Sequence, residues 1–460
     1  MLKRLSKLSK NLSQLFESGT GPHGAKVISA KDHGIANDAV SKNAIRVIKQ
    51  LHAAGFEAYL VGGGVRDLLL GGKPKDFDVA TSATPEQARA VFRGARIIGK
   101  RFRIVHVRFG REIIEVTTFR DSHKEAESAH EAEQSEHGIL LRDNVYGNLR
   151  TDAERRDFTV NALYYNPENG ELLEFSSGLE DLNQRIIRIV GDPETRYKED
   201  PVRLLRAVRF AAKLGFTIEP ATEAPIREHA DYLGHIPPAR LFEEVLKLFM
   251  AGSATATLNL LREYHLLQFL FPSTDYCIEN GRSHDREMIT CATTNTDKRI
   301  RQNKKVTPAF IYAAFLWPAL RASMRHLAKD QQLSTNEAMQ RAAQGLITQQ
   351  LSYTAVPKRF LIPMREIWAM QLRLPRRTGN RAAALLEHPR FRAAYDFLLL
   401  REQAGENLNG LGDWWTRFQS ASEDERVTMV NELSASETSA AAPKPKRRRR
   451  RAPRKPADKD

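Results

Sequence analysis

The chain has 460 residues, of which 41% are hydrophobic and 28% are charged, so it has enough apolar surface for buried cores and is not a globally disordered protein. No apolar run approaches the roughly 18 residues that a transmembrane helix needs, and we therefore expect no transmembrane segment. Lysine and arginine number 71 against 56 acidic residues, and the net charge of +15 predicts a polyanionic partner, either nucleic acid or an anionic membrane surface.

Residues 1–38 predict a flexible basic leader. Leucines and basic residues are interleaved over the first 16 positions, whereas a secretory signal needs a continuous apolar stretch. The same spacing is compatible with a short basic amphipathic helix that makes peripheral contact with a membrane. Four glycine or proline residues between positions 19 and 24 favour the flexible leader.

Residues 39–190 predict a small mixed α/β domain. Apolar residues recur at helical spacing over 43–52, and Thr84 with Gln87 has the pattern of a capping box that opens a second helix. Strand patterns lie at residues 58–61, 76–80, 103–109 and 112–118. The last two are separated by Gly110 and Arg111, which predict a tight turn.

Residues 121–138 are acidic and contain no large apolar residue. They predict a surface loop; the alternative is a metal site built on the three histidines of the segment.

The two cysteines, Cys277 and Cys291, exclude a disulfide framework and a four-cysteine zinc site within one chain. They fit a reducing compartment, and we expect a cytoplasmic protein.

From about residue 192 to residue 433 the pattern is almost wholly helical, with breaks at prolines 237–238, 272, 308 and 357. No repeat of fixed period is present, which argues against a solenoid. We interpret this part as a helical neck, residues 191–270, and a helical body, residues 271–433.

Residues 434–460 predict a disordered basic tail. From position 443 onward ten lysines or arginines face two aspartates, a net charge of +8, and four prolines interrupt the segment. Five consecutive arginines suit phosphate contacts, so we expect them to bind RNA; the alternative is a solubilising tail. These residues are Arg447, Arg448, Arg449, Arg450 and Arg451.

A glycine loop follows the strand predicted at 58–61. Gly62, Gly63 and Gly64 lead from this strand into a helix, an arrangement that presents backbone N–H groups to a phosphate. The spacing matches neither the Walker loop nor the dinucleotide fingerprint, so the glycines alone are also compatible with a simple turn.

Two aspartates sharpen this interpretation. In a strand, Asp76 and Asp78 project from one face, with Phe77 and Val79 toward the core. Carboxylates this close repel each other unless a cation lies between them, and they suit Mg²⁺ with bound phosphates. Glu115, a charge in an otherwise alternating strand, is a candidate third carboxylate.

These segments resemble the nucleotidyltransferase family that comprises bacterial poly(A) polymerases and CCA-adding enzymes. Three segments are similar to the catalytic head of that family. They are the glycine loop through Asp67, the strand from Asp76 to Thr81 and the strand from Glu115 to Arg120. Residues 155–162 are similar to its second signature block, and residues 199–210 to its nucleotide-selecting helix.

The resemblance implies an α+β fold, with an N-terminal mixed α/β nucleotidyltransferase head followed by a mainly helical neck and body. It implies transfer of AMP from ATP to RNA 3′ ends by a two-metal scheme, with Mg²⁺ at Asp76 and Asp78 and with Glu115 as a further catalytic residue. One Mg²⁺ activates the RNA 3′-hydroxyl, the other binds the triphosphate, and pyrophosphate is released. The implied nucleotide-binding residues are Gly62, Gly63, Arg66, Arg156, Asp157, Asn161, Asp200 and Arg203.

The helix that contains Asp200 and Arg203 also has a local interpretation. Asp200 is expected to cap the helix and Pro201 to occupy its first position. The carboxylate and the guanidinium then either form a routine ion pair or, as the resemblance implies, select the incoming base.

One stretch favours poly(A) polymerase over the CCA-adding enzyme. Residues 97–109 resemble the segment that marks poly(A) polymerases, and they bring Lys100, Arg101 and Arg103 beside the predicted site, where they suit RNA phosphates. We therefore expect a template-independent poly(A) polymerase that promotes RNA processing and decay, with RNA 3′ ends, ATP and RNA-decay proteins as partners. The alternatives are a CCA-adding enzyme and a catalytically silent RNA-binding protein on the same fold.

Overall fold

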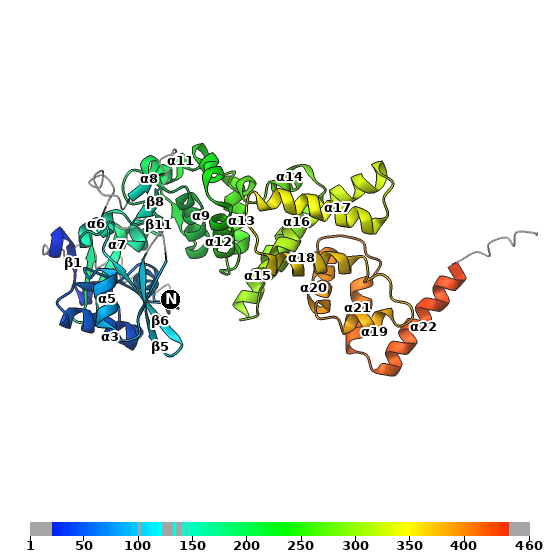
Figure 1. Cartoon of the computed structure of the whole chain (residues 1–460), viewed down its shortest axis with the longest axis horizontal. Helices are drawn as coiled ribbons and strands as arrows, with labels where there is room; N and C mark the ends of the chain where they lie inside the picture. Colours follow the sequence, from blue (N-terminus) through cyan, green and yellow to red (C-terminus); the bar gives the residue numbers. More distant parts are fainter. Residues whose placement is uncertain (1–20, 100–102, 122–131, 135–139, 144, 441–460) are drawn as a thin grey trace, which may run out of the picture. The chain divides into compact units, whose positions relative to one another are not determined.

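The computed structural model describes residues 21–99, 103–121, 132–134, 140–143 and 145–440 (Figure 1). The chain divides into two compact units. The first contains the described residues up to Asn280, with Thr293–Val306 and Gly345–Val356. The second contains Gly281–Ala292, Thr307–Gln344 and the described residues from Pro357 onward. The predicted combination of a mixed α/β head and a helical remainder is confirmed.

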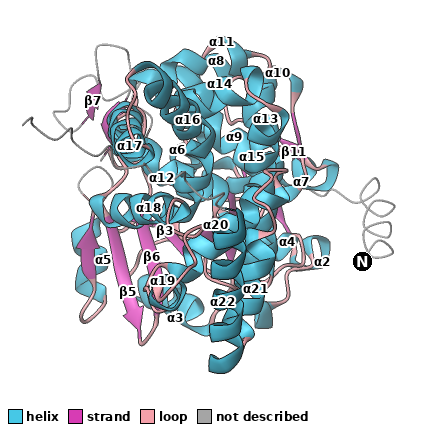
Figure 2. Ribbon diagram, turned by 90° about the vertical axis from the view of Figure 1, so that its right-hand side faces the viewer, coloured by secondary structure: helices cyan, strands magenta, loops and turns pink. Residues whose placement is uncertain are grey.

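An eight-stranded sheet forms the centre of the head, in the order β1-β10-β9-β2-β3-β6-β5-β4. Its strands are β1 (Lys26–Ile28), β2 (Ala58–Val61), β3 (Asp78–Thr81), β4 (Arg96–Ile98), β5 (Ile104–Phe109), β6 (Glu112–Thr118), β9 (Leu163–Asn166) and β10 (Glu171–Glu174). All neighbours are antiparallel except β3 and β6, which run parallel. Figure 2 shows β3, β6 and β5 as neighbouring strands.

Short helices pack around this sheet. They are α2 (Ala30–His33), α3 (Lys42–Ala53), α4 (Gly63–Leu69), α5 (Pro85–Val91), α6 (Leu149–Glu154) and α7 (Gly178–Gln184). Helices α3 and α5 contact each other and the sheet, and α3 buries Val47, Ile48 and Leu51 at the predicted spacing. The capping box of Thr84 and Gln87 is present, because each side chain bonds the backbone N–H of the other residue.

Two predicted boundaries in the head were wrong. Strand β3 begins at Asp78, so Asp76 lies in the irregular segment before it and not in a strand. The part of the predicted leader that the structure describes is folded, because β1 pairs with β10 at the sheet edge. Ala25 packs into a cluster with Tyr59 and Leu173, and Ile28 is also buried, which a flexible leader would not allow.

The acidic segment 121–138 lies largely outside the described residues. The exception within it is β7 (Ala132–Gln134), which pairs with β8 (Leu140–Asp143) in a two-stranded antiparallel sheet. The predicted surface loop therefore contains a strand.

The helices that follow the head within the first unit are α8 (Pro193–Glu199), α9 (Val202–Leu214), α10 (Pro220–Glu223), α11 (Pro225–Glu228), α12 (Pro238–Phe249), α13 (Ala254–Glu263) and α14 (Pro272–Asn280). Helix α9 packs on α12 and α13, and its buried face includes Leu204, Val208 and Phe210. A small parallel pair, β11 (Ile186–Ile187) and β12 (Thr217–Ile218), joins the end of the head to the residues after α9.

The remaining helices are α15 (Ser283–Arg301), α16 (Pro308–Asp330), α17 (Thr335–Leu351), α18 (Lys358–Gln371), α19 (Arg381–Leu386), α20 (Phe391–Gln403), α21 (Leu411–Ser420) and α22 (Glu423–Ala440). Prolines at the predicted breaks start α12, α14 and α16 or immediately precede α18, as expected for a residue that lacks an N–H donor. Helix α22 continues beyond residue 433, where we placed the start of the tail, to Ala440.

Among the described residues, no helix is both long and apolar enough to cross a membrane. Cys277 and Cys291 are both buried and form no disulfide with each other.

The folded state of residues 21–38 can be tested by replacing Ile28 with Ala. Because Ile28 is buried where β1 pairs with β10, the substitution should lower the free energy of unfolding by about 2 kcal/mol. The measurement is equilibrium urea unfolding followed by circular dichroism. Lys31→Ala, at an exposed position nearby, should stay within about 0.5 kcal/mol of the parent. Equal stability of the Ile28 variant and the parent would contradict the folded edge strand.

Candidate active site

A row of three titratable residues crosses the sheet of the head. Asp78 in β3 lies opposite Glu115 in β6, and Glu115 lies opposite His106 in β5. Residues directly opposite each other on paired strands project from the same face. His106 Nε2 lies 3.3 Å from Glu115 Oε1, and the side chain of Glu115 is 44% exposed. The register therefore brings a histidine to two of the three predicted catalytic carboxylates.

Burial and neighbouring charges both shift the pKa of Asp78. Burial, together with the charges of Glu115 and Asp76, raises this pKa to about 6, while Arg156 acts in the opposite direction. Asp76 is exposed in the segment just before β3. The structure thus places Glu115 opposite Asp78 on the neighbouring strand and Asp76 two residues before Asp78, outside the strand.

The donor set fits magnesium bound together with a nucleotide. Within the described part of the chain, no three His, Cys, Asp or Glu side chains converge closely enough to hold a metal ion by themselves. Magnesium in nucleotide-processing sites usually takes one or two protein carboxylates and completes its shell with phosphates and water. Asp76 and Asp78 fit that requirement, since adjacent carboxylates need a cation to be ionised together.

The glycine loop lies against these groups. Gly62 precedes α4 with φ of 74°, a left-handed value that favours glycine. A Cβ atom at Gly62 would lie 3.7 Å from Arg156 Nη1 and 3.9 Å from Asp78 Oδ2. Three predicted segments, distant in sequence, therefore meet at the backbone of Gly62.

Arg66 is engaged inside the head. Its residue is 2% exposed. The guanidinium donates to Asp67 Oδ1 at 2.6 and 2.9 Å and to Asn161 Oδ1 at 2.7 Å, and it lies over the ring of Phe210 at 5.2 Å. The predicted phosphate ligand thus links α4 to the second signature block and to α9.

Asp152 and Tyr164 hold Arg156. The Arg156 guanidinium donates to Asp152 Oδ2 at 2.9 and 3.2 Å and to the Tyr164 hydroxyl at 2.8 Å, and the hydroxyl donates to Asp152 Oδ2 at 2.7 Å. Burial would raise the pKa of Asp152, but the charges of Arg156 and Arg155 lower it below its usual value. Asp152 is therefore an ionised buried anchor for a predicted nucleotide-binding arginine.

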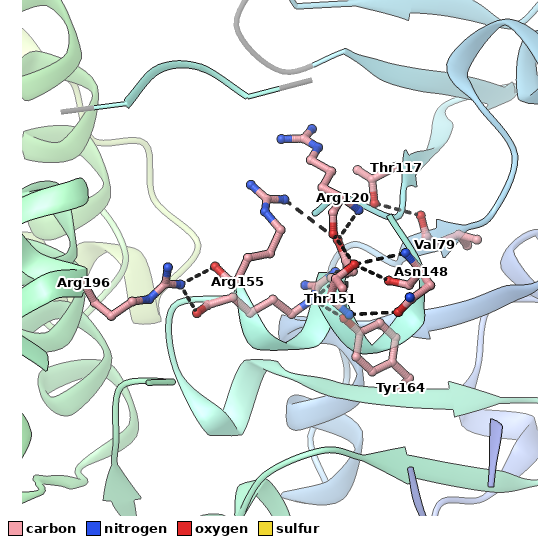
Figure 3. A network of polar contacts seen from close by, with 10 residues as sticks. Val79, Thr117, Arg120, Asn148, Thr151, Arg155, Tyr164 and Arg196 are labelled. Carbon is pink, nitrogen blue, oxygen red and sulfur yellow. Dashed lines mark hydrogen bonds and ion pairs between the residues drawn. The ribbon is translucent and has the colours of Figure 1, made fainter. Parts of the chain in front are cut away.

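The backbone around this anchor is fixed by further hydrogen bonds (Figure 3). The Thr151 hydroxyl donates to the Arg120 carbonyl at 3.0 Å, and the Asn148 side chain accepts from the backbone N–H of Thr151 at 3.1 Å. On the other side, Arg196 of α8 donates to the carbonyls of Arg155 and Arg156. The second signature block is thus bound to the first helix after the head.

Asp157 provides a second link to these helices. It accepts from Arg206 of α9 at 2.6 Å and from Asn161 at 3.1 Å. Burial would raise its pKa, but Arg206 and Asn161 overcome that effect and lower the pKa to about 2. Asp157 is therefore ionised across the physiological pH range.

The predicted start of the nucleotide-selecting helix was wrong by one residue, whereas Asp200 does accept a first-turn N–H as predicted. Pro201 is the N-cap of α9, and the helix begins at Val202, whose N–H bonds Asp200 Oδ1 at 3.3 Å. Asp200 Oδ2 pairs with Arg240 of α12 at 2.6 Å. Arg203 pairs with Glu199 at 3.0 Å and donates to the Arg196 carbonyl at 2.7 Å. Each residue of the pair therefore has its own charged partner.

Of the predicted RNA-binding residues, the structure describes Arg103 alone. Arg103 is exposed and forms an ion pair with Glu86 of α5. Lys100, Arg101 and the run from Arg447 to Arg451 lie outside the described residues.

Sequence reasoning missed four residues that hold the site together: His106, Asp152, Tyr164 and Arg240. Strand alternation in residues 104–109 was a usable signal for His106, since the strand register places it on the face of Glu115. Asp152 lies four residues before Arg156, and this spacing was also a usable signal. Arg240, by contrast, is paired with Asp200, which only the tertiary fold brings near.

Three family models match the chain. Residues 58–188 match the poly A polymerase head domain, residues 215–278 match the "Probable RNA and SrmB-binding site of polymerase A", and residues 331–455 match the polymerase A arginine-rich C-terminus.

Whole-chain relatives agree with these matches. Poly(A) polymerase I of Salmonella typhimurium is 48% identical over 430 residues, 93% of this chain and 92% of that protein. The CCA-adding enzyme of Geobacillus stearothermophilus is 39% identical over only 50% of this chain and 54% of that enzyme. A solved CCA-adding enzyme, apo form II, has a TM-score of 0.57 at 19% identity over 89% of this chain and 99% of its own, which shows a shared fold. The chain therefore belongs to the poly(A) polymerase family and is a polynucleotide adenylyltransferase.

Proposed function

We propose that the site at β3, β6 and the glycine loop is where this enzyme transfers AMP from ATP to the 3′-hydroxyl of RNA and releases pyrophosphate. The observation that carries the proposal is the meeting of Asp78 and Arg156 at the backbone of Gly62, with Glu115 opposite Asp78 on the neighbouring strand. A carboxylate cluster beside a guanidinium and a glycine loop suits a nucleoside triphosphate with its cations.

Asp76 and Asp78 are assigned to hold two Mg²⁺ ions. When bound, the ions neutralise the triphosphate and lower the pKa of the attacking hydroxyl. The two carboxylates supply the negative charge that retains the ions, and the half-buried position of Asp78 keeps that charge in a place of low water content.

Glu115 is assigned to the RNA side of the reaction. Its side chain is 44% exposed and stands between Asp78 and His106. An exposed carboxylate next to the metal-binding pair can support that pair and accept the proton of the 3′-hydroxyl. His106 is a positioning residue for Glu115, because its ring contacts the carboxylate from the neighbouring strand.

The triphosphate is assigned to Gly62, Gly63 and Arg156. The carboxylate of Asp157 and the amide of Asn161 fix the block that follows Arg156, and Arg66 fixes Asn161 in turn. Direct phosphate contact then falls to Arg156, while Arg66 is a positioning residue.

Base selection is assigned to Asp200 and Arg203. Arg240 holds the Asp200 carboxylate and Glu199 holds the Arg203 guanidinium, so both groups are oriented before a nucleotide arrives. A fixed acceptor and a fixed donor set can discriminate base edges, because a mismatched base leaves buried polar groups unpaired.

The proposal extends to the partners and the location. RNA 3′ ends and ATP are the substrates, and the matched model for residues 215–278 is described as an RNA and SrmB-binding site, which supports contact with RNA-processing proteins in the neck. We also propose domain limits of 191–270 for the neck and 271–433 for the body. The protein is assigned to the cytoplasm, with peripheral membrane contact through the leader. RNA contact is assigned to the arginine tail and to Lys100, Arg101 and Arg103.

The assigned carboxylates can be tested by measuring labelled AMP incorporation on two unrelated RNAs. Asp76→Asn and Asp78→Asn should each lower the rate by about 10²-fold or more, because each removes charge that holds the cations. Glu180→Gln, an exposed carboxylate on α7, is the control and should leave the rate unchanged.

The same assay tests the alternatives. Long tails made from ATP alone on both RNAs support poly(A) synthesis. A product limited to a restored CCA end, made from CTP as well as ATP, would support the tRNA enzyme, and no incorporation at any Mg²⁺ concentration would indicate a silent RNA-binding protein.

The raised pKa of Asp78 predicts a cost in stability. Its pKa is about 6 in the folded chain against 3.8 as the ordinary value, so the native state keeps this proton between pH 4 and 6 after the unfolded state has lost it. Stability therefore falls as pH rises through that range, by up to about 3 kcal/mol.

Without divalent cations, Asp78→Asn should therefore be more stable than the parent at pH 7 and equal to it near pH 4. Thermal unfolding at both pH values measures this difference. Mg²⁺ added together with ATP should raise the melting temperature of the parent more than that of the variant. A variant less stable than the parent at pH 7 would contradict the electrostatic account.

The orienting role of Arg240 predicts a loss of base discrimination. In Arg240→Ala the Asp200 carboxylate loses its charged partner, so the ratio of kcat/KM for ATP over CTP should fall about tenfold. The exposed Glu243→Gln on the same helix is the control. An unchanged ratio in Arg240→Ala would show that Asp200 does not need this partner.

A further inference from the structure

We propose that the loop of residues 373–381, which follows α18 and ends at the first residue of α19, is a preformed binding surface for the phosphate backbone of single-stranded RNA. The proposal rests on the proposed function, because it takes an RNA chain as the substrate. It concerns the second compact unit only and names a contact that neither the catalytic residues nor the terminal arginine run provides.

The loop has a strongly one-sided charge. Residues 372–386 contain four arginines and no acidic residue. Arg373, Arg376 and Arg381 are exposed, whereas Arg377 is half-buried. All the cationic groups are arginines, whose planar guanidinium binds a phosphate through two parallel hydrogen bonds.

The backbone of the loop is anchored in the core. Leu374 is fully buried in the cluster that contains Trp414 and Trp415. The Trp415 indole donates to the Leu374 carbonyl at 3.1 Å, and the Arg377 guanidinium lies 4.8 Å from the ring centre of Trp414. The loop is therefore held by the Leu374 carbonyl and by the Arg377 side chain. Such a loop loses little conformational entropy when it binds a ligand, so its arginines form a preorganised surface.

The exposed arginines of the loop lack acidic partners among the described residues. Arg381 bonds only the Thr378 hydroxyl, at 3.5 Å, and Arg373 and Arg376 form no salt bridge within the described part of the chain. Three other exposed arginines of this unit are paired with acidic residues. These pairs are Arg390 with Glu366 at 2.8 Å, Arg392 with Asp396 at 3.0 Å and Arg417 with Asp413 at 3.1 Å. Arg282, Arg325, Arg341, Arg359 and Arg365 of this unit are also exposed and form no salt bridge within the described part of the chain, but they are spread along it. The loop differs from them because it brings three such arginines within nine residues.

A single-stranded RNA fits this surface better than a membrane does. Binding to a lipid surface by a basic segment uses exposed apolar side chains that enter the acyl boundary. The large apolar residues that are exposed in the described chain are Leu70, Ile98, Ile113, Tyr276, Ile362 and Val427, and none of them belongs to residues 372–386. Arginines on a fixed loop without such residues are suited to a phosphate chain in water.

The test compares two triple variants of the full-length chain with the same change in charge. R373Q/R376Q/R381Q removes the unpaired arginines, and R390Q/R392Q/R417Q removes paired ones.

Binding to a fluorescent single-stranded RNA is measured between 50 and 200 mM salt. Each lost phosphate contact lowers the slope of log K against log salt by about 0.7, so the loop variant should lose about 2 from the slope. That shift corresponds to about 20-fold less change in affinity over this salt range. The control should lose less than half as much.

Further readouts separate the possible failures. Thermal unfolding checks that both variants are folded, and AMP addition to a short primer at low salt checks the proposed function independently. Active variants with equal slopes would overturn the loop as an RNA surface while leaving the proposed function intact. Absence of AMP addition by the parent chain would instead overturn the proposed function. Loss of binding to phosphatidylglycerol vesicles with an unchanged RNA slope would also overturn the proposal, in favour of a membrane contact.

Discussion

Repulsion between carboxylates on neighbouring strands is the constraint on which the rest of the head depends. The parallel register of β3 and β6 places Asp78 opposite Glu115, and Asp76 lies just before the same strand. Hydrophobic packing beneath the row, including fully buried Val79 and Val116, holds the strands in this register against the repulsion. The repulsion lowers the stability of the folded head, but it leaves these carboxylates able to attract cations. A carboxylate that a close internal partner had already neutralised would attract a cation less strongly.

Arginines of α8 and α9, the helices that follow the head, contact the second signature block at residues 155–162. Arg196 binds the backbone at Arg155 and Arg156, Arg206 binds Asp157, and Arg66 of the head reaches Phe210 of α9. Charge-assisted hydrogen bonds of this kind are strong and directional. The block of residues 155–162 and helix α9 are therefore positioned by one another, so that in the proposed assignment the groups for the base and for the phosphates belong to one connected arrangement.

Local patterns in the sequence predicted much of the head and the helical order. The strands at 58–61 and 112–118 and the capping box at Thr84 were confirmed because alternation and capping are short-range properties. The edge strand β1 was missed because a three-residue strand just after Pro22 and Gly24 carries too little local signal, and its pairing with β10 spans almost 150 positions. Partners such as Arg240 for Asp200 could not be predicted for the same reason, since they depend on how helices far apart in the sequence pack.

The single parallel pair in the sheet has a consequence for how the family can diversify. Parallel neighbours require a crossover, and here the crossover between β3 and β6 consists of α5, β4 and β5. The stretch at residues 97–109 that resembles the poly(A) polymerase marker lies within this crossover. Its two ends are pinned by the register of Asp78 with Glu115, whereas its interior forms the sheet edge at β4. Substitutions that change which RNA is accepted can thus accumulate in the crossover while the spacing of the catalytic carboxylates is inherited unchanged.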